Sequence, residues 1–188
     1  GAFPGDGDAL EQLTLMAFIA AKTEKLRLVS SVMILPHRNP VATAKMLATV
    51  DVLSKGRVTV GVGVGWMAEE FDALNAPDFA KRGAVSDEYL EIFAKLWTGE
   101  PVSHNGASYQ FNEVSCQPTP VQRPGPPIWI GGHSRPALRR AAKYGHGWHP
   151  VGANAAAPLP PDEMAVLISE LKQLTVAEGR DFDAMTLS

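Results

Sequence analysis

The 188-residue chain has little of several features that mark particular protein classes. Its single cysteine, Cys116, cannot form an intrachain disulfide, and we expect a small, half-buried residue rather than a nucleophile. The formal net charge of −3, without a basic stripe, argues against nucleic-acid binding. No apolar run approaches the ~20 residues of a membrane span, and no signal-like segment opens the chain. A cytoplasmic location without membrane partners is therefore the expectation.

Metal ligands are also scarce. The chain has five histidines, and none are paired at metal-ligand spacing on one helix. His146 and His149 are three residues apart, but in a strand-like setting, so we predict no metal site. With 45% hydrophobic residues, the composition is that of a globular protein with a substantial core.

Helix-like and strand-like segments alternate along the chain. Residues 1–8 are expected to form a loop, with Asp8 as the N-cap of the first helix, and Asn39-Pro40 opens the second. Helical periodicity covers 9–23, 40–54, 82–97, 134–142 and 162–178. Strands are predicted at 26–35, 57–62, 128–130, from 146 and at 182–187, and a small-residue loop at 153–161. This alternation predicts a parallel sheet with strands that are apolar on both faces.

Two architectures fit this order: an open doubly wound sheet, or part of a (β/α)8 barrel. A chain that starts on a helix favours the barrel, and we expect residues 1–188 to form a single partial barrel domain. Six prolines fall within residues 98–127, which we predict to be an insertion with a hairpin around Asn105-Gly106. Arg139 and Arg140 are expected on a solvated helix face, and Asp51 with Arg57 in a cap and ion pair.

Both architectures bind ligands at the carboxyl ends of the strands. Three such ends have unusual compositions: Ser30 to Val32, Gly61 to Trp66, and Gly131 to Ser134. Glycines there let a backbone approach a planar or anionic ligand. The last end also precedes a helix, whose free N–H groups favour a phosphate. A plain tight turn is the alternative for it.

The second of these ends could be mistaken for a dinucleotide fingerprint. That pattern requires a third glycine where this chain has Trp66, so the match fails. Trp66 could stack on a ring or roof the barrel. Glu69 and Glu70 could face the site, or form the solvated first turn of a helix.

Taken together, these motifs resemble the bacterial luciferase-like monooxygenase superfamily, and within it the branch that uses the deazaflavin coenzyme F420. The resemblance covers nearly the whole chain, and the order of its motifs carries it. The motifs are TEKLRL (23–28), LPHRNP (35–40), DVLSKGR (51–57), GVGVGW (61–66) with EEF (69–71), Arg82, LWTGEP (96–101), PPIWIGG (126–132) and GHGW (145–148).

The resemblance implies a luciferase-like (β/α)8 barrel, of which the chain would hold about strands 3 to 7. It also implies a non-proline cis peptide at Ser31–Val32 that supports the cofactor ring. The phosphate would meet Gly131, Gly132 and Ser134, and the ring edge would lie near Gly63 and Gly65. Relatives often dimerise, so a homodimer is one expectation.

The function implied is hydride transfer with coenzyme F420 to or from a small-molecule substrate. The alternatives are an FMN-dependent monooxygenase and a non-catalytic, cofactor-binding barrel relative. Two departures from the family pattern matter: Trp66 replaces a carboxylate found in some deazaflavin enzymes, and His146 replaces a frequent aspartate. No catalytic residue is identified, because the first two strands are not in the sequence.

Overall fold

The computed structural model describes residues 8–154 and 157–188; most of the loop expected over 1–8, and residues 155–156 of the loop expected over 153–161, lie outside them. The helices are α1 (Gln12–Lys22), α2 (Pro40–Ser54), α3 (Ala68–Ala73), α4 (Arg82–Leu96), α5 (Arg135–Tyr144) and α6 (Pro161–Ala177), with 3-10 turns η1 (Leu35–His37) and η2 (Phe79–Lys81).

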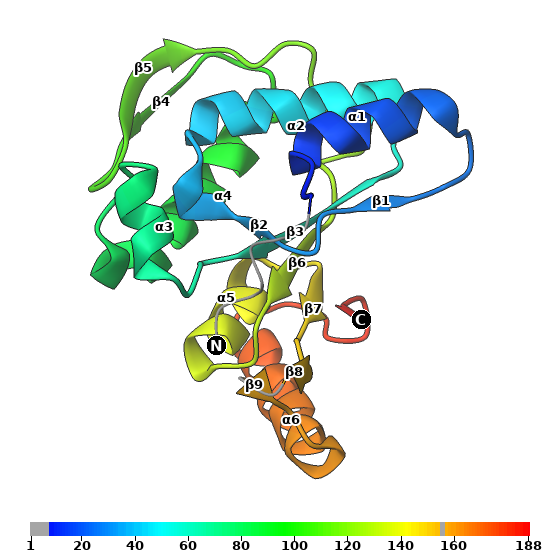
Figure 1. Ribbon diagram of the computed structural model, residues 1–188, viewed down its shortest axis with the longest axis vertical. Helices are drawn as coiled ribbons and strands as arrows, with labels where there is room; N and C mark the ends of the chain where they lie inside the picture. The colour runs from blue at the N-terminus through cyan, green and yellow to red at the C-terminus, as the bar shows by residue number, and fades with distance from the viewer. Residues whose placement is uncertain (1–7, 155–156) are drawn as a thin grey trace.

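One parallel sheet organises the fold (Figure 1). Its strands are β1 (Leu28–Val29), β2 (Met33–Ile34), β3 (Val58–Gly63), β6 (Ile128–Gly131), β7 (Gly147–His149) and β10 (Thr186–Leu187). Their order is β1-β3-β6-β7-β10, with β2 also paired to β3, so the sheet follows the sequence without a reversal. A doubly wound sheet reverses its strand order at a switch point. The doubly wound alternative is therefore wrong, and the chain forms an incomplete α/β barrel.

The helices are arranged as in the outer ring of a barrel. Successive helices pack side by side in the pairs α1 with α2, α2 with α4, α4 with α5, and α5 with α6. Alternate strand residues face them and are fully buried, among them Val60, Ile130 and Trp148. Burying such side chains contributes roughly 1.5–3 kcal/mol each, so this layer supplies much of the stability.

The opposite, inner face of the sheet is not apolar, contrary to expectation. Residues on one face alternate along a strand, and those in register on neighbouring strands share a face. The inner face therefore carries Arg27, Val29, Ile34, Thr59, Gly61, Gly63, Trp129, Gly131, Gly147, His149, Thr186 and Ser188. Small and polar residues dominate this set, so the inner face can accept a ligand.

Two local predictions need correction. The strand expected over 26–35 is interrupted, because Ser30 and Ser31 separate β1 from β2 and the Ser31–Val32 peptide is cis, as predicted. The N-cap of α1 is Glu11 rather than Asp8, and its carboxylate accepts from the N–H groups of Leu13 and Thr14. Asn39 caps α2 as expected.

Arginines join successive helices and strands. Arg57 donates to the carbonyl oxygens of Ala20 and Thr23 at the end of α1, whereas Asp51 accepts from Gln122, so these two residues do not form the expected pair. Arg140 is also not solvated: it is buried and pairs with Asp87 on α4. The last carbonyl groups of a helix have no hydrogen-bond donor within the helix and need one from elsewhere. Arg57 supplies such donors at the end of α1.

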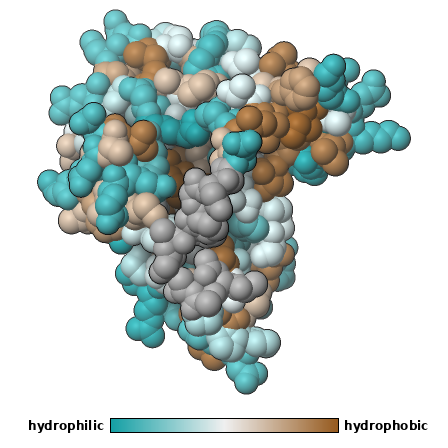
Figure 2. Space-filling view, in the orientation of Figure 1, coloured by the Kyte–Doolittle hydropathy of each residue, from teal (hydrophilic) through white to brown (hydrophobic). Residues whose placement is uncertain are grey.

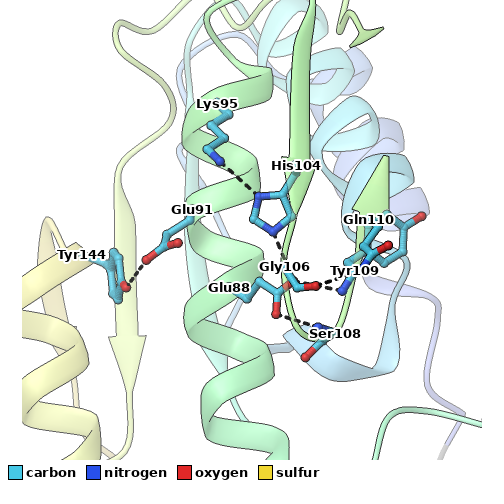
Figure 3. Close-up of polar contacts among 9 residues, drawn as sticks. All are labelled: Glu88, Glu91, Lys95, His104, Gly106, Ser108, Tyr109, Gln110 and Tyr144. Atoms are coloured by element: carbon cyan, nitrogen blue, oxygen red, sulfur yellow. Dashed lines mark hydrogen bonds and ion pairs between the residues drawn. The ribbon is translucent and has the colours of Figure 1, made fainter. Parts of the chain in front are cut away.

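Residues 98–127 leave the alternation between α4 and β6. They contain the antiparallel pair β4 (Val102–Asn105) and β5 (Gln110–Val114), which forms the hairpin expected around Asn105-Gly106. Figure 3 shows how a polar cluster fixes this hairpin to α4. Glu88 accepts from the N–H groups of Ser108 and Tyr109 and lies 3.1 Å from His104 Nε2.

The loop expected at 153–161 contains a second small pair, β8 (Ala153–Asn154) with β9 (Ala157–Pro158). Among the described helices, none has the length and apolar character needed to cross a membrane. Figure 2 shows a hydrophobic area where Figure 1 places α1 and β1. The exposed large apolar side chains of this part include Phe18, Leu26 and Val29, beside the end strand of the sheet.

Candidate functional site

The carboxyl ends of β3 and β6 meet around the side chain of Val32, the residue that precedes β2. A Cβ added to Gly63 would lie 2.9 Å from Val32 Cγ2, and one added to Gly131 would lie 3.0 Å from Val32 Cγ1. A Cβ at Gly61 would lie 1.9 Å from the Ser30 carbonyl oxygen. These glycines therefore make room for the backbone and side chain of the Ser30–Val32 segment itself.

This packing explains why glycine is needed at these positions, and the explanation differs from the one that the sequence suggested. They were expected to admit a ligand, whereas the space next to their Cα atoms is filled by the chain. Val32 is half-buried and Ser31 is exposed, so the segment offers its remaining surface to the interior of the barrel. The result is a small platform that crosses the inner face of the sheet.

Gly65 lies at the rim of this platform. Its φ of +84° is in the left-handed region, and a Cβ there would be 2.7 Å from the Phe71 ring. Phe71 makes edge contacts with His37 and Phe79, while Arg82 covers Phe79 and donates to the Gly65 carbonyl oxygen. The rim is thus an aromatic wall held in place by one arginine.

His37 in this wall is partly buried. Its Nε2 is buried without a hydrogen-bond partner among the described residues. Desolvation lowers the pKa of His37 and nearby Arg38 lowers it further, with Glu70 acting in the opposite direction. The neutral imidazole is therefore favoured.

The start of α5 lies beside the same platform. Gly132 has a φ of +85°, and its carbonyl oxygen accepts from Trp148 Nε1. Ser134 is exposed and caps α5, accepting from the Ala137 N–H at 3.4 Å. His133 Nδ1 is buried and has no partner in the described chain. This end combines a helix N-terminus, a hydroxyl and an unpaired ring nitrogen.

A histidine that the sequence reasoning did not select crosses the inner face. His149 ends β7, and its Nε2 lies 2.9 Å from Ser31 Oγ, while its Nδ1 lies 3.0 Å from Ser188 Oγ. The indole of Trp129 lies next to it, with ring centroids 6.0 Å apart. Strand parity was the available signal, since His149 shares the inner face with Gly147 and Gly131.

The contact between Ser31 and His149 also reports curvature. β3 and β6 lie between β2 and β7 in the sheet. Three strand spacings amount to about 14 Å in a flat sheet, which two side chains standing on it do not bridge at hydrogen-bond distance. The sheet is therefore curled around this face.

The predicted site residues fall into three groups. Val32 contacts Gly63 and Gly131, with Ser31 next to it in the chain; Gly65 lies at the rim; Gly132 and Ser134 lie at the start of α5. Their roles in binding a cofactor stay predictions. Several other candidates lie elsewhere.

Glu69 and Glu70 are exposed in the first turn of α3, and Trp66 is 59% exposed. His146 accepts from the Ile128 N–H at the opposite end of β7, and burial and Arg180 lower its pKa. Cys116 is buried, which raises the pKa of its thiol and disfavours a reactive thiolate. Within the described residues no three acidic, histidine or cysteine side chains are grouped to hold a metal ion.

Comparison with known proteins identifies similar sequences. The sequence pattern described as luciferase-like monooxygenase matches residues 1–188. The chain is 34% identical over 147 residues to an FMNH(2)-dependent dimethylsulfone monooxygenase of Pseudomonas putida, covering 77% of this chain and 40% of that protein. It is 29% identical over 182 residues to the pyrimidine monooxygenase RutA of Allorhizobium ampelinum, covering 95% and 48%.

Solved structures share the fold. The monooxygenase RslO1 of Streptomyces bottropensis superposes with a TM-score of 0.80 at 28% identity, covering 91% of this chain and 51% of that one. The coenzyme F420-dependent tetrahydromethanopterin reductase of Methanopyrus kandleri superposes at 0.81 with 20% identity, covering 95% and 53%, which shows the fold alone. The chain thus spans about half the length of these relatives.

Proposed function

Because the chain belongs to the luciferase-like monooxygenase family, we propose that it forms the cofactor-binding part of a flavin-dependent oxidoreductase. We further propose that the cofactor is reduced FMN and the reaction a monooxygenation of a small organic molecule. The observation that carries this proposal is the platform of Val32 on glycines 63 and 131, beside the start of α5.

The residues present fit a flavin phosphate. A planar ring needs a flat, mainly apolar support, and the half-exposed Val32 offers one beside Gly63 and Gly131. A phosphate needs donors and a positive potential, which a helix N-terminus supplies. Exposed Ser134 and the unpaired His133 Nδ1 can add hydrogen bonds there. The left-handed Gly132 permits the turn between the two parts.

Reduced FMN, when bound, supplies the electrons for oxygen activation, while the protein orients the substrate and excludes water. In this chain the aromatic wall, with Phe71 buried between the half-buried His37 and Phe79, is suited to excluding water. Val32 would set the height of the ring, and Ser134 would fix its phosphate end. The substrate itself would be selected by loops.

Coenzyme F420 remains the second candidate, on the sequence motifs that resemble its branch. The relatives named above include an FMNH(2)-dependent enzyme at 34% identity, whereas the F420-dependent structure is similar only in fold. FMN therefore takes the first place here. A carrier without catalytic activity is the third candidate.

The direct test is an anaerobic titration of the full-length protein with FMN, reduced FMN and coenzyme F420, followed by assays for turnover. Two variants of one residue then locate the phosphate. Ser134→Asp and Ser134→Asn both keep a good helix N-cap, but only the first adds a negative charge. Unit charges a few ångströms apart near a protein surface interact by about 1–4 kcal/mol. Ser134→Asp should therefore weaken FMN binding at least about fivefold, and Ser134→Asn much less.

Riboflavin, which lacks the phosphate, is the matched ligand and should bind both variants equally. Equal FMN affinity in the two variants would place the phosphate elsewhere. Tight binding of F420 without FMN would reverse the choice of cofactor. Cofactor binding without turnover over a panel of organic substrates would favour the carrier.

A further inference from the structure

We propose that His149 acts as a proton relay to the cofactor-facing platform, passing a proton through the hydroxyl of Ser31. This inference rests on the proposed flavin site, since it gives a role to a residue on the same inner face. His149 lies two residues after Gly147 at the end of β7, and Ser31 directly precedes Val32.

The contacts of the imidazole carry the argument. Ser31 Oγ is 2.9 Å from Nε2 and Ser188 Oγ is 3.0 Å from Nδ1, so each ring nitrogen meets a hydroxyl. A hydroxyl can donate or accept, whereas a backbone amide or carbonyl has one fixed role. The ring can therefore be neutral in either tautomer, or protonated, while both hydrogen bonds persist. Such a ring exchanges protons without rearrangement.

Two other histidines, His146 and His104, have hydrogen-bond partners of a different kind. His146 accepts the Ile128 N–H at Nδ1, which fixes its tautomer and favours the neutral ring. His104 lies between Lys95 and Glu88, so the ammonium requires an acceptor at Nδ1 and the carboxylate a donor at Nε2 (Figure 3). The partners of both rings fix which nitrogen donates and which accepts, whereas the two hydroxyl partners of His149 do not.

No charged side chain is among the contacts described for the His149 imidazole. Its contacts are the hydroxyls of Ser31 and Ser188 and the indole of Trp129, and none of these groups is charged at neutral pH. On the same face, Arg27 is held by the Thr59 hydroxyl, deeper toward the amino ends of the strands.

The transfer balances in protons. As His149 gives its Nε2 proton to Ser31 Oγ, Ser31 passes its own hydroxyl proton to a basic atom of the reacting group. The ring, which starts as the imidazolium, is left neutral with its remaining proton on Nδ1, where it is donated to Ser188 Oγ, and Nε2 then recovers a proton from water through the Ser31 hydroxyl. Because Ser31 is exposed toward the interior, it can reach a molecule that rests on Val32. His149 itself is a positioning and relay residue that acts through Ser31.

The test uses the full-length protein and three variants. His149→Gln keeps polar contacts but cannot titrate near neutral pH; Ser31→Ala removes the relay; His146→Gln removes the neighbouring imidazole as a control. Proton transfer by a placed side chain contributes on the order of 100-fold or more. We expect kcat/KM to fall on that order in His149→Gln and Ser31→Ala, with loss of the pH-rate limb that His149 contributes. His146→Gln should keep that limb.

A second readout needs no turnover. In cofactor-free protein with labelled histidines, one imidazole NMR signal should vanish in His149→Gln, and its titration midpoint should move in Ser31→Ala but not in His146→Gln. An unchanged midpoint in Ser31→Ala, or an unchanged pH limb in His149→Gln, would overturn the relay. Absent flavin binding with an intact Ser31–His149 coupling would instead overturn the proposed function.

Discussion

At the scale of single residues, the site depends on close packing between Val32 and glycines. Gly63 and Gly131 belong to different strands, yet the two methyl groups of Val32 occupy the space that a side chain at either position would need. A branched valine cannot swing away from both strands at once, because its χ1 angle is restricted. Glycine is therefore required at these positions by packing, in addition to any demand from a ligand.

A double-mutant cycle tests this packing. Gly63→Ala places a Cβ at 2.9 Å from Val32 and should lower the free energy of unfolding by about 1–3 kcal/mol, as overpacking does. Val32→Ala removes the obstructing methyl groups, so the double variant should be more stable than the sum of the two single effects. Urea unfolding measures all four proteins. Additive effects on the free energy of unfolding would show that Val32 is not what restricts the side chain at position 63.

A second prediction at this scale concerns the acidic N-cap of α1. Partial burial of Glu11 opposes its ionisation, but hydrogen bonds from Thr14, Leu13 and Arg38 prevail and lower its pKa to about 2, from an ordinary 4.5. The ionised form therefore stabilises the folded state above about pH 4.5, and this contribution is lost as the pH falls through about 2.

Glu11→Gln should consequently reduce stability by about 0.5–2 kcal/mol at pH 7, the usual range for a lost N-cap. The difference from the unmodified protein should shrink between pH 4.5 and pH 2, as measured by urea unfolding over that range. A difference that does not depend on pH would show that charge is not involved. Because the side chain of Glu11 is 47% exposed, the smaller end of the range is expected.

At the scale of elements, polar contacts rather than sheet pairing hold the 98–127 segment. The β4–β5 hairpin touches α4 through Glu88, whose side chain is only 12% exposed. Burial opposes ionisation of Glu88, yet donors from Ser108, Tyr109 and His104 lower its pKa. One carboxylate thus satisfies three donors of the hairpin.

Glu88→Ala leaves these donors without their acceptor, at a cost of about 1–3 kcal/mol. We expect amide hydrogen exchange of residues 102–114 to accelerate, while exchange in the sheet strands stays unchanged. Glu91→Ala is the control one turn along α4: its carboxylate is 46% exposed and contacts Tyr144 and Lys143 instead. Equal acceleration in both variants would assign the effect to α4 itself.

At the scale of the whole molecule, curvature gathers residues that are distant in sequence. Ser31, between β1 and β2, reaches His149 at the end of β7 only because the sheet curls around the inner face that Gly63, Gly131 and His149 share. A ligand bound there contacts several strand–helix units together. It therefore binds the folded state and not the separate units.

This predicts that a bound flavin stabilises the protein. At a free FMN concentration 100 times its Kd, the free energy of unfolding of the full-length protein should rise by about 2.7 kcal/mol. Ser134→Asp should need a proportionally higher FMN concentration for the same gain. Unfolding curves that do not respond to FMN at concentrations where titration shows binding would place the flavin away from the folded core.

The sequence by itself determined the order of elements, the parallel sheet, the cap at Asn39, the hairpin and the end of the sheet where the glycines gather. Those features follow from local periodicity, turn residues and motif order, which act over a few residues. Only the tertiary structure decided which strand residues share the inner face. It also decided that Val32 fills the space beside Gly63, that Arg140 is buried, and that His149 meets Ser31. These depend on curvature and side-chain packing between segments up to 118 residues apart, which no local pattern encodes.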